Sequence, residues 1–485
     1  MPRAAEPTAP TRRPDRGPLD LDRARGRTLD AVTTTAPPGI RDELFGPRRR
    51  AVTVGIVLLI SLVAFEAMGV GTAMPALVAD LGSVRDYSWP FVAFAAATVV
   101  GTVAGGRWCD ARGPRRVLLG APVLFGTGLL VAALAPSLPV LLVGRVLQGA
   151  GAGAQGVAVY VLVALVYSPA ARPAVFALIS SAWVVPSLVG PPVAGLLAEQ
   201  ASWRWVFGGL LPLVVLALVL VAPVARRQEP PSRPAAARRG LVPAAVVAAT
   251  AVAAVSWAAD HTATTPLTGG LVGVLALAVL LPAVRVLVPR GTLLARRGVA
   301  AVVAGRGLLS GAFFTATAFL PLMLTEVHGW SLTAAGLPLI VGSLGWSASS
   351  AWQGRRPELS RPVLLRAGFA CVGLALAGLL LVTPTWGVPW LALPLWALAG
   401  TGMGLGFSSL SFLLLAASAP ERVGFHSSAA QLADQLAQAV VIGIGGALLA
   451  VLASVTGGLT ALVVLLLGMA ALGAALAPRT APVAG

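Results

Sequence analysis

The sequence predicts an all-α polytopic membrane protein, and three observations favour that fold class. Of the 485 residues, 57% are hydrophobic and 11% are charged, whereas soluble domains have about 45–50% apolar and about 25% charged residues. The apolar residues gather in long blocks, many exceeding the ~18 residues that mark a candidate transmembrane helix. The arginines lie almost wholly in short connections between these blocks, which is the charge pattern of membrane topology.

The blocks fall into two sets of six. The first 50 residues are rich in Pro, Arg, Thr and Ala and lack the apolar core of a signal peptide, which predicts a disordered cytoplasmic tail. A charged, Pro-rich linker separates the two sets and is followed by two segments just long enough to cross a bilayer core of ~30 Å. The predicted divisions are a tail (1–50), a first six-helix bundle (51–225), a linker (226–240), an extra two-helix hairpin (241–290), a second six-helix bundle (291–478) and a cytoplasmic tail (479–485).

Together the blocks predict 14 spans with both termini inside. With that topology, 20 arginines beyond the tail fall in cytoplasmic loops and only Arg85 and Arg204 fall outside, as the positive-inside rule expects. A twelve-span version, in which 241–285 lies on the membrane surface, keeps both termini inside and stays open. The expected spans are 51–79, 89–107, 116–135, 138–167, 174–199, 203–224, 241–259, 267–285, 298–325, 331–352, 362–383, 387–417, 424–454 and 456–478.

Composition also limits the function classes. The net charge of +17 belongs to the tail and loops, so it does not indicate a nucleic-acid partner. The chain contains no Lys, which excludes a Walker-type phosphate loop, so any transport must be driven by a gradient. Cys109 and Cys371 form no metal or redox spacing, and we expect neither metal nor cofactor. Two six-span halves predict a transporter with a binding site near the midplane.

The connection between spans two and three reads GRWCDARGPRR at 106–116. It resembles the G-x-x-x-D-(R/K)-x-G-R-(R/K) signature of the major facilitator superfamily, although Ala111 and Pro114 replace two usually basic positions. A carboxylate among arginines at a membrane edge can lock neighbouring helices in one state and release them in another. The alternative is an ordinary cytoplasmic loop with an incidental acid. The residues assigned to this motif are Gly106, Asp110, Arg112, Gly113, Arg115 and Arg116.

Span four reads LLVGRVLQGAGAG at 141–153 and resembles the L-x-x-x-R-x-x-Q-G-x-G-A motif of the same superfamily. Its central residues are Arg145, Gln148 and Gly149. A guanidinium inside an apolar helix is costly, so we expect Arg145 to face the bundle interior with a partner and to have a functional role. Snorkelling to the outer headgroups is the alternative.

Span five reads WVVPSLVGPPVAG at 183–195 and resembles the G-x-x-x-G-P-x-x-G-G motif of antiporters in this superfamily. Gly190, Pro191 and Gly195 match, whereas Pro186 and Ala194 replace two of the motif's glycines. The prolines predict a kinked helix that serves as a hinge or seal between the halves.

Span one carries Glu66 nine residues before Pro75. This spacing resembles the L-D-x-T-x-x-x-x-A-L-P motif of fourteen-span drug:proton antiporters, although Ala67 through Gly71 depart from it. A carboxyl near the membrane centre is desolvated, which favours its protonated form and suits it to carry a proton. A structural partner for Arg145 is the alternative, and the two roles can coexist.

Span thirteen places Gln431, Asp434 and Gln435 on one helix face. This arrangement resembles the acidic position often found in that span of fourteen-span exporters, which implies coupling or substrate recognition. The alternative is a buried acid satisfied by its glutamine neighbours. Arg306 lies eight residues into span nine, where it could act in function or snorkel inward.

The resemblance implies a monomeric, multi-pass protein of the bacterial inner (plasma) membrane that exports a small amphipathic compound in exchange for protons. It would be no enzyme, and its partners would be the substrate, protons and the lipid bilayer. Two other hypotheses stay open. One is a dedicated exporter of an endogenous metabolite such as an antibiotic or a siderophore. The other is a non-transport scaffold or lipid-handling protein built on the same fold.

Overall fold

The computed structural model describes residues 40–47, 49–229, 240–261, 265–356, 358–419, 422–452 and 454–481. Throughout these ranges the ordered elements are helices, and no strand is present. Thirteen of the helical segments are long and apolar enough to cross a membrane. The first 39 residues of the predicted tail, most of the predicted linker (230–239) and the last four residues lie outside the described ranges.

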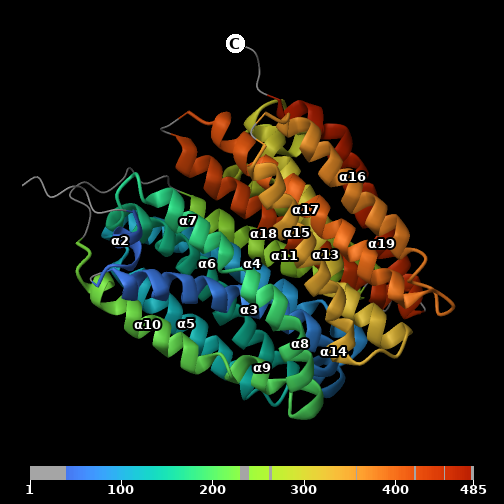
Figure 1. The fold of residues 1–485 in the computed structure, drawn as a ribbon. Helices are drawn as coiled ribbons and strands as arrows, with labels where there is room; N and C mark the ends of the chain where they lie inside the picture. The colour runs from blue at the N-terminus through green and yellow to red at the C-terminus, as the bar shows by residue number, and fades with distance from the viewer. Residues whose placement is uncertain are drawn as a thin grey trace, which may run out of the picture.

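The helices form a first bundle, a hairpin and a second bundle in chain order (Figure 1). The first bundle contains α3 (Arg50–Leu81), α4 (Trp89–Arg112), α5 (Arg115–Ala133), α6 (Leu138–Val166), α7 (Arg172–Ser181), α8 (Val184–Gln200), α9 (Arg204–Gly208) and α10 (Leu211–Arg226). The hairpin consists of α11 (Leu241–His261) and α12 (Pro266–Leu287). The second bundle contains α13 (Val299–Leu322), α14 (Leu332–Ala335), α15 (Leu337–Gly354), α16 (Arg361–Leu379), α17 (Ala392–Ala416), α18 (Val423–Val451) and α19 (Val455–Leu476).

The expected span at 174–199 differs from the prediction because it is two helices, α7 and α8, separated by Ala182 and Trp183. The break lies four residues before Pro186, whose ring clashes with the carbonyl of Ala182 and whose nitrogen cannot donate to it. Ser61 of α3 donates its hydroxyl to that carbonyl at 3.0 Å, so the freed acceptor is satisfied. In contrast, α8 continues through Pro191 and Pro192.

The hairpin is built into the body of the protein, because α11 packs against both α4 of the first bundle and α18 of the second. Trp89 at the start of α4 donates its indole N–H to Asp260 of α11 at 2.7 Å. On the other side, a Cβ on Gly443 of α18 would lie 2.2 Å from the Ser256 hydroxyl of α11. Helix α11 therefore covers one side of the seam between the bundles.

The bundles also contact each other at the end remote from the chain termini, where α8 meets α14 (Figure 1). Glu199 accepts hydrogen bonds from the backbone N–H of Thr333 at 2.9 Å and from its hydroxyl at 2.8 Å. At this crossing a Cβ on Gly195 would lie 2.7 Å from the backbone of Thr333. Nearby, the Tyr87 hydroxyl donates to the carbonyl of Ala318 at 2.6 Å. These contacts close the remote end of the interface.

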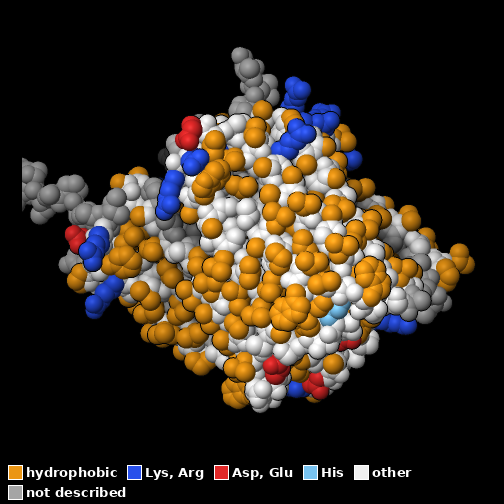
Figure 2. Space-filling view, turned by 45° about the vertical axis from the view of Figure 1, so that its right-hand side comes forward, with side chains coloured by type: hydrophobic (Ala, Val, Ile, Leu, Met, Phe, Trp, Pro, Cys, Tyr) orange, Lys and Arg blue, Asp and Glu red, His pale blue; other side chains and the backbone are white. Residues whose placement is uncertain are grey.

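The surface has the pattern of a membrane protein. Figure 2 shows apolar side chains over the central band of one face, with basic side chains at its upper and left-hand edges and a few basic and acidic ones along its lower edge. In helix α12, Leu267, Leu271 and Val274 are 88%, 70% and 68% exposed, which only a lipid environment makes favourable over so large an area.

Part of the predicted tail is ordered, which departs from the expectation of disorder up to residue 50. Residues Ile40–Phe45 form the short helix α2, and Glu43 is only 8% exposed. Its carboxylate accepts from the Ser168 backbone N–H at 2.6 Å, from the Ser168 hydroxyl at 2.7 Å and from Arg49 at 2.5 Å. These hydrogen bonds, led by the one from the Ser168 backbone, lower the pKa of Glu43 and dock α2 on the α6–α7 connection.

Candidate functional site

A buried ion pair joins the first helix of the first bundle to its fourth. Glu66 of α3 and Arg145 of α6 are 0% and 2% exposed, and Arg145 Nη1 donates to Glu66 Oε1. Helix α4 packs closely against α6 beside this pair. A Cβ on Gly149 would lie 2.2 Å from the carbonyl oxygen of Phe94, so only glycine permits that approach.

The rest of the Arg145 guanidinium is also held by the first bundle. Its Nε donates to the carbonyl of Pro90 at 3.0 Å, and Nη1 donates to Gln148 at 2.6 Å. Its plane lies over the Phe94 ring, with Cζ 4.5 Å from the ring centroid. Glu66 Oε2 is buried and has no hydrogen-bond partner among the described residues. This oxygen is the one place in the cluster where a carboxyl proton can be added without displacing an existing bond.

A second ion pair lies in the second bundle, between Arg306 of α13 and Asp434 of α18. Arg306 Nη2 lies 2.5 Å from Asp434 Oδ2, and Nε lies 3.1 Å from both carboxylate oxygens. Ser310 donates its hydroxyl to Asp434 Oδ1 at 2.9 Å, and Arg306 Nη1 donates to Ser411 at 3.1 Å. This pair is more accessible than the first, since the side chains of Arg306 and Asp434 are 12% and 11% exposed.

The two pairs differ in which partner the first helix of the bundle carries. In the first bundle the acid lies on the first helix, α3, whereas in the second bundle the base lies on the first helix, α13. Each pair ties the first helix of its bundle to another helix by charge. Protonation of either carboxylate would leave an unbalanced guanidinium in a nearly dry site, so each pair can respond to protons or to a charged ligand.

Aromatic rings adjoin the Arg306–Asp434 pair. The Arg306 guanidinium lies over Phe407, 3.9 Å from the ring centroid. Phe407 in turn contacts Trp346 at 5.7 Å between centroids, and Trp346 contacts Phe313 at 5.8 Å and Phe314 at 6.0 Å. All but Phe313 are half-buried, so the cluster offers both apolar area and a cation-binding face to a ligand.

Gln431 and Gln435 of span thirteen point toward the first bundle. Gln435 forms hydrogen bonds of 3.3 and 3.4 Å with the Thr102 hydroxyl of α4. A Cβ on Gly156 of α6 would lie 4.0 Å from Gln431 Nε2. Asp434, between them in sequence, turns instead to α13. Helix α18 thus presents an acid to its own bundle and amides to the other.

The signature at 106–116 lies mostly in helix, because α4 extends to Arg112 and α5 starts at Arg115. Gly113 has φ of +79°, a value that favours glycine, and ends α4. Arg112 lies over the Trp108 ring at 4.9 Å. Asp110, Arg112, Arg115 and Arg116 are exposed, and among the described residues no ion pair joins Asp110 to these three arginines. Gly106 has room around it, since a Cβ there would meet only Val157, at 3.5 Å.

The span-five residues take part in the contact between helices. Gly190 packs against Met68 and Gly69 of α3, and Gly195 against Thr333 of α14. Pro191 lies 3.0 Å from the position of a Cβ on Gly336. Pro191 and Gly195 therefore lie at the contact between the bundles, whereas Gly190 lies at a contact within the first bundle.

The sequence reasoning missed the partner of Arg306. It also missed the two hydroxyls, Ser310 and Ser411, that complete the second cluster. One signal was present: Arg306 and Ser310 are four residues apart and so lie on one helix face. No group of three or more metal-ligating side chains occurs in the part of the chain that the structure describes.

Two bundles of helices long and apolar enough to cross a membrane, with a buried ion pair in each, define a polytopic membrane protein. The model of the Major Facilitator Superfamily matches residues 56–442, and the chain belongs to that superfamily as a multi-pass membrane protein.

The relatives agree with that family. An uncharacterized MFS-type transporter of Mycobacterium tuberculosis is 30% identical over 411 residues, which are 81% of this chain and 59% of that protein. The chain thus matches less than two thirds of that relative's length. A probable multidrug-efflux transporter of the same species is 34% identical over 152 residues, 31% of this chain and 32% of that one. The Acurin A biosynthesis cluster MFS-type transporter of Aspergillus aculeatus is 29% identical over 186 residues, 38% of this chain and 33% of that one.

Among solved structures, a POT family transporter in complex with 5-aminolevulinic acid has a similar fold. The TM-score is 0.68 at 15% sequence identity, and the match covers 90% of this chain and 97% of that one. At this identity the likeness concerns the fold alone.

Proposed function

We propose that this transporter exports a small amphipathic compound in exchange for protons. The observation that carries the proposal is the pair of buried carboxylate–arginine clusters, one in each bundle. An ion pair requires a charged carboxylate, so in this proposal the paired geometry belongs to the form that has released its protons. The half-buried aromatic rings beside Arg306 and the efflux function named for one relative favour an amphipathic substrate.

We place both termini in the cytoplasm and count α7 with α8 as one interrupted span, which gives 14 spans in the plasma membrane of a bacterium. The end closed by Glu199 and Thr333 is then the outer end, and the described state is closed to the outside. Substrate arriving from the cytoplasm or inner leaflet meets Arg306, Asp434 and the aromatic rings. We propose that the protein works as a monomer.

Coupling follows from competition for the carboxylates. When the protein opens outward, protons bind Asp434 and Glu66 and weaken their hold on Arg306 and Arg145. When it opens inward, substrate and the arginines favour the deprotonated forms. Only a ligand with different affinities for the two states can shift their equilibrium, and this competition supplies the difference. Asp434 exchanges protons first, because its pair is the more accessible one.

The test is proton movement in energised inside-out vesicles on addition of cationic and neutral drugs, with Glu66→Gln and Asp434→Asn compared to the parent. Substrate-dependent proton release that is lost in either variant supports antiport. If no compound moves protons and both variants behave like the parent, drug antiport is wrong. The dedicated metabolite exporter, which the biosynthesis-cluster relative favours, and the non-transport scaffold would then remain.

A further inference from the structure

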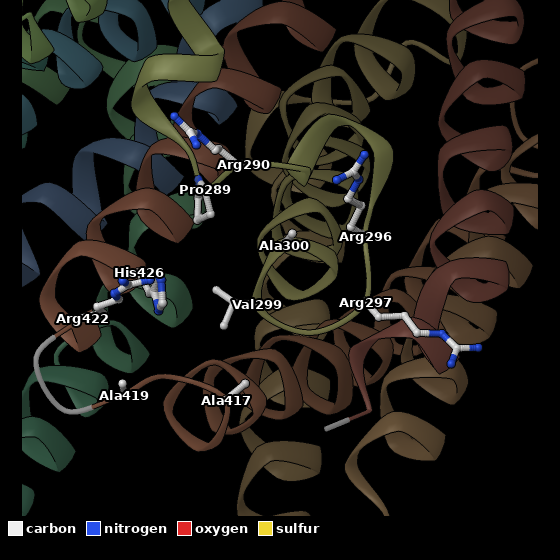
Figure 3. A pocket seen from close by; sticks show the side chains of 10 residues that line it. All are labelled: Pro289, Arg290, Arg296, Arg297, Val299, Ala300, Ala417, Ala419, Arg422 and His426. Atoms are coloured by element: carbon white, nitrogen blue, oxygen red, sulfur yellow. The ribbon is translucent and has the colours of Figure 1, made fainter. Parts of the chain in front are cut away.

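A basic pocket lies where the loop after the extra hairpin meets the second bundle, away from both ion pairs. It has a volume of about 500 Å³. Figure 3 shows that Arg290 and Arg296 come from the loop, that Arg422 and His426 come from the start of α18, and that Val299 at the start of α13 lies among them. Arg297 also lines the pocket, but its guanidinium points away from the others in the same view.

The positive charge of this pocket is not neutralised within the described part of the chain. Arg290, Arg296 and Arg422 are exposed, and no ion pair between described residues involves them. Helix α13 begins at Val299 without a side-chain cap, so the first N–H groups of a 24-residue helix add partial positive charge on the same side. Arginines from two separate elements therefore line one pocket, and arginine binds phosphate groups in a forked geometry.

The loop is shaped to present these arginines. Gly291 has φ of +90°, and a Cβ there would lie 2.7 Å from Cδ of Arg296. The Arg296 stem therefore lies across the glycine, and its backbone N–H donates to the Gly291 carbonyl at 3.1 Å. Ala295, at φ of +43°, is the one non-glycine residue with positive φ in the described chain. Such a conformation persists only where the surroundings impose it.

The same loop also carries exposed apolar side chains. Leu293 and Leu294 are 47% and 68% exposed, although they stand between Arg290 and Arg296 in sequence. The pocket lining also includes the apolar residues Val299, Ala300 and Ala417. A site for a free aqueous anion needs neither exposed leucines nor an apolar lining. A loop that lies at the membrane surface and binds a lipid needs both. Basic pockets between transmembrane helices on the cytoplasmic side bind lipid headgroups.

We propose that this pocket binds the phosphate headgroup of an anionic phospholipid from the adjacent leaflet. The headgroup bridges the loop that follows the hairpin and the start of α18, while Leu293 and Leu294 insert among the acyl chains. The lipid thereby ties the extra hairpin to the helix that carries Asp434. This site is independent of the proposed proton exchange.

The test is native mass spectrometry of the full-length protein in detergent, with phosphatidylglycerol, phosphatidylcholine and inorganic phosphate as separate probes. The pocket variant is Arg290→Gln/Arg296→Gln/Arg422→Gln. The control, Arg226→Gln/Arg227→Gln/Arg366→Gln, removes the same charge from three exposed cytoplasmic-side arginines outside the pocket. We expect preferential binding of phosphatidylglycerol, weakened about tenfold or more in the pocket variant and little changed in the control.

Three results would overturn the proposal. Equal loss in the two triple variants would mean that only net charge matters. Equal binding of phosphatidylcholine would mean that the headgroup charge is not recognised. Inorganic phosphate that competes fully with the lipid at the same arginines would make the ligand a soluble anion. Should the pocket triple variant fold poorly, Arg422→Gln alone is expected to weaken lipid binding several-fold and serves as the second variant.

Discussion

Arg306 and Asp434, 128 residues apart in sequence, form an ion pair in which three guanidinium–carboxylate contacts of 2.5 to 3.1 Å join α13 to α18. The pair is nearly buried and is completed by the hydroxyls of Ser310 and Ser411. It therefore links α13 to α18 by charge as well as by packing. Any change in the protonation of Asp434 acts directly on that link.

Asp434→Asn should destabilise the protein, because it leaves the Arg306 guanidinium without its counter-charge in a nearly dry site. Removing one partner of a buried pair typically costs about 3–5 kcal/mol. Arg306→Gln/Asp434→Asn should recover part of that loss. Thermal unfolding in detergent of the parent, Asp434→Asn, Arg306→Gln and the double variant measures the coupling energy between the two side chains. Single variants that unfold at the parent's temperature would show that the pair contributes nothing to stability.

Arg145→Lys should also destabilise, although it keeps the charge beside Glu66. A lysine cannot reproduce the Nε hydrogen bond to the Pro90 carbonyl or the planar contact with Phe94. We expect a loss of about 1–3 kcal/mol. Arg366→Lys, at an exposed position, is the matched control and should unfold like the parent. Equal stability of Arg145→Lys and the control would contradict the described geometry.

Gly195→Ala should open the seam at the Glu199–Thr333 end. The new Cβ would lie 2.7 Å from the Thr333 backbone, which cannot move aside as a flexible side chain can. Spin labels at Gln200 and Ser331, both exposed, should lie farther apart in Gly195→Ala than in the parent when measured by double electron–electron resonance. Gly120→Ala is the control, because nothing lies within 4 Å of its Cβ. An unchanged distance distribution in Gly195→Ala would refute the closed seam.

Docking of α2 should depend on pH through Glu43. Its pKa lies below the ordinary value of 4.5, chiefly because the Ser168 backbone N–H donates to it. A lowered pKa in the folded state means that its contribution to stability is full above about pH 4.5 and is lost as the pH falls further. The protection factor of the Ser168 amide, which corrects for the pH dependence of intrinsic exchange, should therefore fall on acidification. In Glu43→Gln it should already be low at neutral pH. A high protection factor that does not change with pH in both proteins would exclude this role.

Much of the fold was predictable because lipid imposes strong constraints on sequence. Each span needs a long apolar block, so α3, α6 and α18 lie close to their expected bounds. The break before Pro186 was less predictable. The sequence shows the proline, but a kink and a full interruption differ by whether a neighbour such as Ser61 can satisfy the freed carbonyl, and that depends on tertiary packing.

The sequence singles out the charged residues within the spans and offers Glu66 as a partner for Arg145, but it does not indicate the Arg306–Asp434 pair. Glu66, Arg145 and Asp434 are conspicuous because charge is rare inside apolar helices. Their partners depend on which helices become neighbours. Arg306 could equally have reached the headgroups, and only the packing of α13 against α18 places it on Asp434. The ordered helix α2 was missed because its single apolar contact face is too short to give a periodic signal.

The most direct test of proton-coupled export uses purified protein in liposomes with an imposed pH gradient and no other energy source. Substrate should move against its own gradient in the direction opposite to protons, and reversing the pH gradient should reverse that movement. Asp434→Asn should abolish the gradient-driven movement. Transport that is indifferent to the pH gradient, or that is equally fast in Asp434→Asn and the parent, would contradict the account.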